Sequence, residues 1–255
     1  MSLTGRRVLV VGAGSLPSEE DDPPVSNGRA ISVTAARQGA AVACADRDEG
    51  SAAETVAWIE RDGGRAEVIV GDVSDAGTCA RVVEEAAERL GGLDGVVCNV
   101  GTGGGTGLEG TTPEVWDFVM NVNVRSHFLV ARAALPLLAA GGAVVFIGSV
   151  AGSKPGSRIP AYDTSKAALG GLTRHVAMEG ARSGVRANLV APGLIDTVLG
   201  RLATAGRPGR AKTPVPLGRQ GTAWEVAEVV CYLLSDGASY VTGQTIAVDG
   251  GLSML

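Results

Sequence analysis

Aromatic side chains and histidines are scarce in this sequence, and the cysteines form no recognisable site. Aromatics make up 4% of the 255 residues, and there are 2 histidines. The 4 cysteines lie far apart and include no CxxC pair, which disfavours a disulfide framework or a zinc site and fits a reducing compartment. We therefore expect a cytoplasmic protein that needs no metal ion.

Excess positive charge and long hydrophobic runs are also missing. The net charge of −5 argues against general nucleic-acid binding. No stretch reaches the roughly 18 apolar residues of a membrane span. The first apolar run, at Val8, leads into a turn without the cleavage region of a signal peptide. Neither nucleic acid nor a membrane is therefore expected as a partner.

What the sequence does contain is an alternation of short β-branched runs and helical patterns. The length suits one α/β domain, and 45% apolar residues supply its core. The runs predict strands at residues 7–11, 41–45, 67–71, 95–98, 143–147, 186–190 and 245–248. The patterns predict helices at residues 29–37, 51–62, 78–90, 113–139, 161–181 and 223–234.

This alternation predicts a single doubly wound, Rossmann-type domain over residues 1–255. Its parallel seven-stranded sheet would be covered by helices on both faces, because strands such as residues 143–147 are apolar at consecutive positions. Two segments read as loops: residues 16–25, acidic and proline-bearing, and residues 197–216, a basic and mobile lid. Ligands of such a sheet bind outside the carboxyl ends of its strands.

Glycines follow the first predicted strand and open the first predicted helix. Glycine lets the backbone approach the phosphates of a dinucleotide, and a helix N-terminus offers them N–H groups. The pyrophosphate contacts expected here come from Gly12, Gly14, Ser15, Asn27 and Gly28. The alternative is an ordinary strand–helix turn.

An acidic residue, Asp46, ends the second predicted strand. It can accept the ribose hydroxyls of an adenosine and would repel a 2′-phosphate, so NAD is favoured over NADP. The neighbouring Arg47 could partly neutralise Asp46, and a solvated carboxylate remains the alternative. Further candidate cofactor contacts follow the third and fourth predicted strands at Asp72, Val73, Asn99 and Gly101.

The most specific chemical signal is the trio Ser149, Tyr162 and Lys166. Tyr162 and Lys166 stand four apart in a helical pattern and so share one face. An ammonium near a phenol lowers the pKa of the phenol, which makes tyrosine usable as an acid or base. Ser149 could hydrogen-bond a substrate oxygen. The alternatives are a surface pair of Tyr162 and Lys166 with no catalytic role, and a serine that only caps the turn after its strand.

These motifs together resemble the short-chain dehydrogenase/reductase family nearly end to end. Tyr162 and Lys166 resemble its YxxxK motif, with Ser149 thirteen residues before the tyrosine. The resemblance implies that Asn123 completes a catalytic tetrad by holding a relay water. It also implies contacts to the nicotinamide end from Tyr162, Lys166, Pro192, Gly193, Ile195 and Thr197.

The opening turn departs from the family pattern TGxxxGxG. Val11 takes the threonine position, Ser26 stands where the middle glycine belongs, and residues 16–25 are inserted before it. We expect the insertion to bulge outward, because a longer loop costs only about 0.6 kcal/mol per doubling of length. Its four acids could face basic residues of the lid, namely Arg201, Arg207, Arg210 and Lys212. Two independent solvated loops are the alternative.

The resemblance implies an NAD-dependent oxidoreductase that interconverts a secondary alcohol and a ketone, with Tyr162 as the general acid/base. It also implies a homo-oligomer, a tetramer or a dimer. A 3-oxoacyl-thioester reductase is the alternative among enzymes, although Asp46 disfavours NADP. Enoyl reductases of the superfamily have their tyrosine and lysine six residues apart, so the four-residue spacing here argues against that branch. A non-catalytic cofactor-binding regulator is the alternative from another class.

Overall fold

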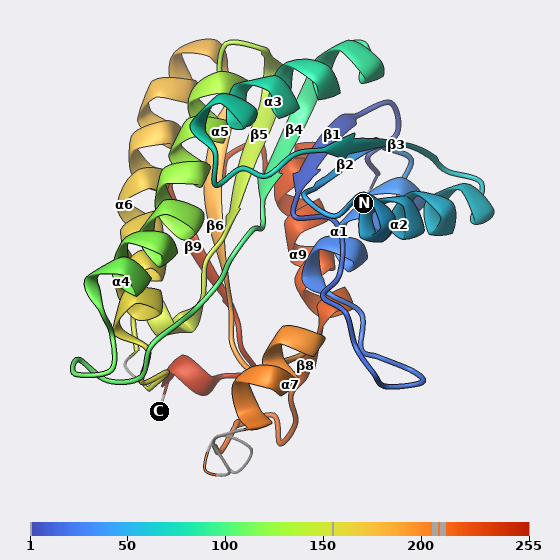
Figure 1. The fold of residues 1–255 in the computed structure, drawn as a ribbon. Helices are drawn as coiled ribbons and strands as arrows, with labels where there is room; N and C mark the ends of the chain where they lie inside the picture. Colours follow the sequence, from blue (N-terminus) through green and yellow to red (C-terminus); the bar gives the residue numbers. More distant parts are fainter. Residues whose placement is uncertain (1, 155, 206–208, 210–212, 255) are drawn as a thin grey trace.

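The computed structural model describes residues 2–154, 156–205, 209 and 213–254, and it contains the predicted seven-stranded parallel sheet (Figure 1). The strand order is β3-β2-β1-β4-β5-β6-β9, so the doubly wound class is confirmed and the order reverses between β1 and β4. The strands are β1 (Arg7–Val11), β2 (Ala41–Asp46), β3 (Arg65–Val70), β4 (Leu93–Cys98), β5 (Leu138–Ile147), β6 (Arg186–Pro192) and β9 (Thr245–Val248).

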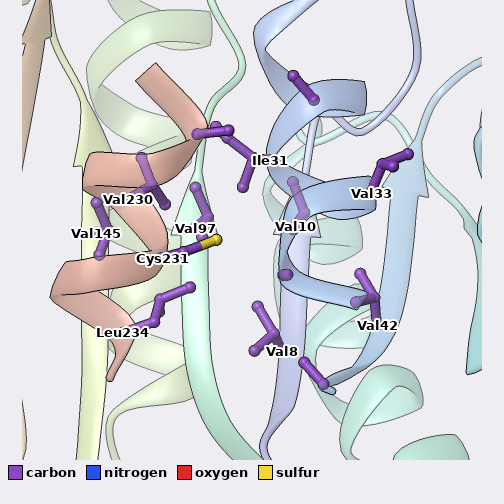
Figure 2. Close-up of a cluster of buried hydrophobic side chains, with 14 of the residues drawn as sticks. Val8, Val10, Ile31, Val33, Val42, Val97, Val145, Val230, Cys231 and Leu234 are labelled. Carbon is purple, nitrogen blue, oxygen red and sulfur yellow. The ribbon is translucent and has the colours of Figure 1, made fainter. Parts of the chain in front are cut away.

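Helices cover both faces of the sheet. One face packs against α1 (Asn27–Arg37), α2 (Glu49–Arg61) and α9 (Ala223–Leu234), and the other against α3 (Ala76–Leu90), α5 (Ser126–Ala134) and α6 (Pro160–Gly180). Figure 2 shows the first core, where valines of β1, β2, β4 and β5 meet α1 and α9. Successive side chains of β1 enter opposite cores, Val8 and Val10 on one face and Leu9 and Val11 on the other, which is why this strand is apolar at consecutive positions.

Capping residues fix where the helices begin. Ser26 caps α1, Asp48 caps α2 and Asp75 caps α3, each by accepting a backbone N–H from the first turn. Thr222 and Glu225 form a reciprocal capping box on α9. Each cap stands in the connection after a strand, so the helix N-termini gather at the carboxyl edge of the sheet.

The predicted helix over residues 113–139 was too long and too regular. It consists of α4 (Pro113–Met120), a π-helical turn (Asn121–Arg125) and α5, which ends at Ala134. Leu138 already belongs to β5 and is buried in the core. A run of apolar residues fits a buried strand as well as a helix, so hydrophobic pattern alone could not place this boundary.

The lid segment is also more ordered than a loop. It contains α7 (Val198–Ala205), and a two-residue pair joins β7 (Ile195–Asp196) to β8 (Gly221–Thr222). Val198 of α7 is buried, whereas its other large apolar side chains, Leu199 and Leu202, are exposed. Residues 206–208 and 210–212, with Arg207, Arg210 and Lys212, lie outside the described residues.

Among the helices of the described ranges, none is both long enough and apolar enough to span a bilayer.

Candidate active site

The turn after β1 is closely packed on the start of α1. A Cβ on Gly28 would lie 1.8 Å from the Gly12 carbonyl oxygen, so only glycine fits there. A Cβ on Gly14 would lie 2.6 Å from Ser51 Oγ. The Asn27 Oδ1 atom beside Gly28 is buried without a hydrogen-bond partner in the described structure. A turn that only glycine fits, at the N-terminus of a helix, is the kind of surface that holds the pyrophosphate of a dinucleotide.

The insertion leaves this turn closed at its base. The Ser26 hydroxyl donates to the Gly14 carbonyl oxygen at 2.7 Å and accepts the Arg29 N–H at 3.3 Å. Residues 16–23 are exposed, and their loop projects from the lower right of the molecule (Figure 1). The serine in the middle-glycine position therefore joins the two ends of the insertion.

Asp46 faces the same turn from the end of β2. Its Oδ2 accepts the Gly14 N–H at 2.9 Å, and its Oδ1 accepts the Asp48 N–H at 3.2 Å. Arg47 is exposed and makes no ion pair with Asp46 in the described structure. Across the switch point, Asn99 Nδ2 donates to the Gly12 carbonyl oxygen at 2.8 Å. The ends of β1, β2 and β4 thus meet at one turn.

The remaining predicted cofactor residues lie along the same carboxyl edge. Asp72 follows β3 and accepts the Ser74 N–H at 2.9 Å, while its neighbour Val73 is buried. Pro192 ends β6, and the Gly193 N–H donates to the Val248 carbonyl at 3.0 Å. Ile195 opens β7, and Thr197 Oγ1 accepts the Gly200 N–H at 3.0 Å, at the start of α7.

Tyr162 and Lys166 lie one turn apart at the beginning of α6. Pro160 occupies the first turn of this helix, where its missing N–H costs nothing. The Lys166 Nζ lies 5.7 Å from the centroid of the Tyr162 ring and donates to the Ile147 carbonyl at 2.9 Å. Burial lowers the pKa of Lys166 to about 8. The ammonium is therefore held beside the tyrosine in a dry environment.

Asn123 lies in the π-helical turn and is fully buried. Its Oδ1 accepts the Thr102 N–H at 2.8 Å, and its Nδ2 donates to the Thr102 carbonyl at 2.8 Å and to Ser165 Oγ at 2.9 Å. The side-chain amide is therefore engaged with the loop after β4 and with α6.

Ser149 completes the arrangement just after β5. Its Oγ accepts the Ala151 N–H at 3.2 Å, and its hydroxyl proton meets no acceptor among the described residues. Ser149 is two residues beyond Ile147, whose carbonyl binds Lys166. A Cβ on Gly101 would lie 3.2 Å from Lys166 Nζ. The structure thus brings the ends of β4 and β5 to the first turns of α6.

No local pattern indicates three residues that organise this site, Ser51, Thr102 and Ser165. Ser51 binds the backbone of Ser15 through both its donor and its acceptor, and Thr102 and Ser165 hold Asn123. Arg158, between Ser149 and Tyr162, has a left-handed φ of 62°. The contacts of Ser51, Thr102 and Ser165 join segments far apart in the chain, so no local pattern predicts them.

The two histidines stand outside the catalytic group. His127 is buried, its Nδ1 lies 3.1 Å from Ser126 Oγ, and its ring stacks on Phe146. Burial lowers the pKa of His127 to about 3, so its imidazole stays neutral. His175 is exposed beside Glu179 at 3.4 Å. Both positions are compatible with the structural roles expected of histidines within helices.

Comparisons with known proteins bear on this arrangement. A family model described as enoyl-(acyl carrier protein) reductase matches residues 25–253. The chain is 36% identical to 2-(S)-hydroxypropyl-CoM dehydrogenase 3 of Xanthobacter autotrophicus, over 89% of this chain and 92% of that protein. It is 34% identical to the 3-oxoacyl-[acyl-carrier-protein] reductase FabG of Thermotoga maritima, over 99% of both.

A solved structure shows the same architecture. The short-chain dehydrogenase of Burkholderia cenocepacia J2315 in complex with NADP superposes with a TM-score of 0.87. The two chains are 30% identical, and the match covers 99% of each.

Proposed function

Because the chain belongs to the short-chain dehydrogenase/reductase family, we propose that it is an NAD-dependent oxidoreductase that interconverts a secondary alcohol and a ketone. The observation that carries this proposal is the Lys166 ammonium beside the Tyr162 ring, 5.7 Å from its centroid. The pair faces the edge of the sheet that also holds the glycine turn. The four-residue spacing of the two residues supports alcohol–ketone chemistry rather than enoyl reduction.

The residues at the carboxyl edge fit a nicotinamide dinucleotide. Its pyrophosphate would lie on Gly12, Gly14, Ser15, Asn27 and Gly28. Its adenosine would lie against Asp46, Arg47, Asp72 and Val73, and its nicotinamide half would lie among Asn99, Gly101, Tyr162, Lys166, Pro192, Gly193, Ile195 and Thr197. When bound, the cofactor supplies or accepts the hydride.

Each catalytic side chain has a separate task in this mechanism. Tyr162 exchanges a proton with the substrate oxygen, and the charge of Lys166 favours the phenolate form that accepts it. Ser149 donates its free hydroxyl proton to the same oxygen as negative charge develops there. Asn123 fixes the loop after β4 through its side-chain amide and, as the family likeness implies, would hold the relay water that returns the proton.

The preference for NAD rests on Asp46. A carboxylate that already faces Gly14 at the end of β2 would lie close to a 2′-phosphate and repel it. The similar Burkholderia protein was crystallised with NADP, so both cofactors belong in the test. Calorimetric titration of NAD and NADP should show tighter NAD binding. Asp46→Ser should narrow the difference, and equal affinities in the unaltered protein would contradict the preference.

A 3-oxoacyl-thioester reductase is the second candidate, favoured by the likeness to the Thermotoga enzyme along 99% of both chains. A panel of secondary alcohols with NAD, and of 3-oxoacyl thioesters with NADH and NADPH, separates the two. Tyr162→Phe should lower turnover by about 10³-fold while retaining cofactor binding. Full activity in this variant would rule out the mechanism, and cofactor binding without turnover on any substrate would favour a regulator.

The proposal includes a cytoplasmic location and a homo-oligomeric state. All four cysteines are buried free thiols, which suits the cytoplasm. Phe118 and Phe128 are about half exposed on α4 and α5, and such apolar surface supports a homo-oligomer, a tetramer or a dimer. Light scattering of the purified protein measures which assembly it forms.

A further inference from the structure

The insertion and the lid are joined by an ion pair between Glu20 and Arg201. Arg201 is anchored on its own segment, because its Nε and Nη2 donate to the two oxygens of Asp196 at 2.7 and 2.8 Å. Its Nη1 then reaches Glu20 in the loop after β1. Two stretches 181 positions apart in the sequence therefore meet through one guanidinium.

This contact lies between the two ends of the proposed cofactor site. The insertion emerges from the turn assigned to the pyrophosphate, and α7 follows the segment assigned to the nicotinamide. Figure 1 shows both at the lower end of the molecule, where the carboxyl ends of the strands point. A bridge between these two segments therefore joins the two sides of the proposed dinucleotide site.

The lid helix has few other attachments. Only Val198 of α7 is buried, and a cavity of about 480 Å³ opens between α7 and β8. Arg201 lines this cavity together with Asp196 and Gly200. Val198 thus packs the start of the helix against the protein, and the Glu20 contact adds an attachment at Arg201, the fourth helical residue.

The insertion projects outward, away from the glycine turn (Figure 1). Its base is closed by the bond from Ser26 to Gly14 at 2.7 Å, and residues 16–23 are exposed. Glu19, Asp21 and Asp22 meet no cation among the described residues, whereas Glu20 does. The contact is therefore specific to one of four consecutive carboxylates.

We propose that Glu20 and Arg201 form a strap that closes over the bound dinucleotide and slows its release. This inference rests on the proposed function, because it assigns the groove to a nicotinamide cofactor. Both side chains are nearly half exposed, at 46% and 45%. An exposed pair of this kind should slow release by up to about fivefold, and salt should weaken it.

The test measures the dissociation of NADH by stopped-flow fluorescence in the full-length protein. Glu20→Gln and Arg201→Gln should each release NADH about threefold to fivefold faster at low salt. The double variant should be no faster than the faster single variant. Glu19→Gln, the matched control one residue away, should release NADH at the unaltered rate. At 0.5 M NaCl, a screening concentration chosen for the assay, the variants should converge.

Every outcome decides the proposal. Release from Glu20→Gln that is unchanged, slower, or matched by Glu19→Gln would overturn the strap while leaving the oxidoreductase intact. Additive effects of the two single variants would also overturn it, because the residues would then act separately. If the unaltered protein bound neither NADH nor NADPH, the proposed function itself would fail, and the strap with it.

Discussion

The two walls of the proposed cofactor cleft differ in how they are held. On the wall formed by the π-helical turn and α6, Asn123 and Lys166 are buried and their polar atoms bind neighbouring backbone and side chains. On the opposite side, the insertion after β1 is exposed, and Glu20 meets Arg201 in a contact open to water. The first wall can hold reacting groups in one geometry, whereas the second can open and close.

This difference explains how the chain accommodates ten extra residues in its most demanding turn. The insertion lies between Ser15 and Ser26, and the hydrogen bond from the Ser26 hydroxyl to the Gly14 carbonyl oxygen holds its two ends together. An exposed loop costs little to lengthen. The same ten residues within the loop after β4 would displace Thr102, on which the buried Asn123 depends.

The largest effect is expected from Lys166→Met, which removes the buried charge of the first wall. Turnover should fall by about 10³-fold, because Tyr162 loses the cation that favours its phenolate. The free energy of unfolding at pH 7 should nonetheless rise. The buried lysine has a pKa of about 8, against 10.5 when exposed, so folding at neutral pH must keep a poorly solvated ammonium charged.

The sign of this stability change follows from proton binding. Between pH 8 and 10.5 the unfolded chain binds a proton that the folded chain has released, so the unaltered protein gains stability as pH rises. At pH 7 the Lys166→Met variant avoids the cost of burying a charged ammonium, about 3 kcal/mol. It also loses the hydrogen bond to the Ile147 carbonyl, about 1 kcal/mol, so its free energy of unfolding should rise by about 2 kcal/mol. Urea unfolding at pH 7 and pH 10 measures both values. Lys154→Met, at a lysine that binds the Leu252 carbonyl, is the control. A gain in unfolding free energy that is equal at both pH values, or that Lys154→Met shows equally, would contradict this explanation.

A smaller loss of activity but a clear loss of stability is expected from Asn123→Ala. The change leaves the Thr102 N–H and carbonyl without their partner in a buried site, which should cost about 3 kcal/mol of unfolding free energy. Turnover should fall by about 10²-fold, because the loop beside Lys166 loses its support.

The matched control for Asn123→Ala is Asn121→Ala in the same π-helical turn. The Asn121 side chain donates to the Ser74 carbonyl at 2.9 Å and accepts from Arg125 at 3.3 Å, so it binds the loop after β3 rather than Thr102. Its loss should cost about 1 kcal/mol and leave turnover within about twofold. If Asn121→Ala lowered turnover and unfolding free energy as much as Asn123→Ala, the hydrogen bonds of Asn123 would have no special importance for the site.

The sequence predicted most of the fold because long-range order here follows from local pattern. The strands at residues 7–11 and 245–248 and the helix at residues 223–234 have the boundaries expected of them. α7 was missed because it is only eight residues long and lies in a segment poor in large apolar residues, a composition that predicts a loop. The end of α5 was misplaced because its last apolar residues belong to β5.

The site was predictable only where a motif has fixed spacing. Tyr162 and Lys166 carry their relation in the sequence, one helical turn apart, and the structure brings the ammonium to the tyrosine ring. Ser26 replaces a glycine, and nothing in its neighbours tells that its hydroxyl would bind Gly14 twelve residues away. Such contacts arise from tertiary packing and appear only once the fold is assembled.

The smallest effect is expected from deleting residues 16–25, which joins Ser15 to Ser26 directly. The catalytic wall lies on other elements, so hydride transfer in a single turnover should stay within about twofold of the intact protein. The free energy of unfolding should rise by up to about 1 kcal/mol, because the shorter loop costs less entropy to close. Adding Ser26→Ala in the deleted protein should then cost about 1 kcal/mol through the lost cap of α1. Rapid-quench kinetics and urea unfolding measure these changes, and loss of hydride transfer on deletion would show that the exposed side supports the chemistry after all.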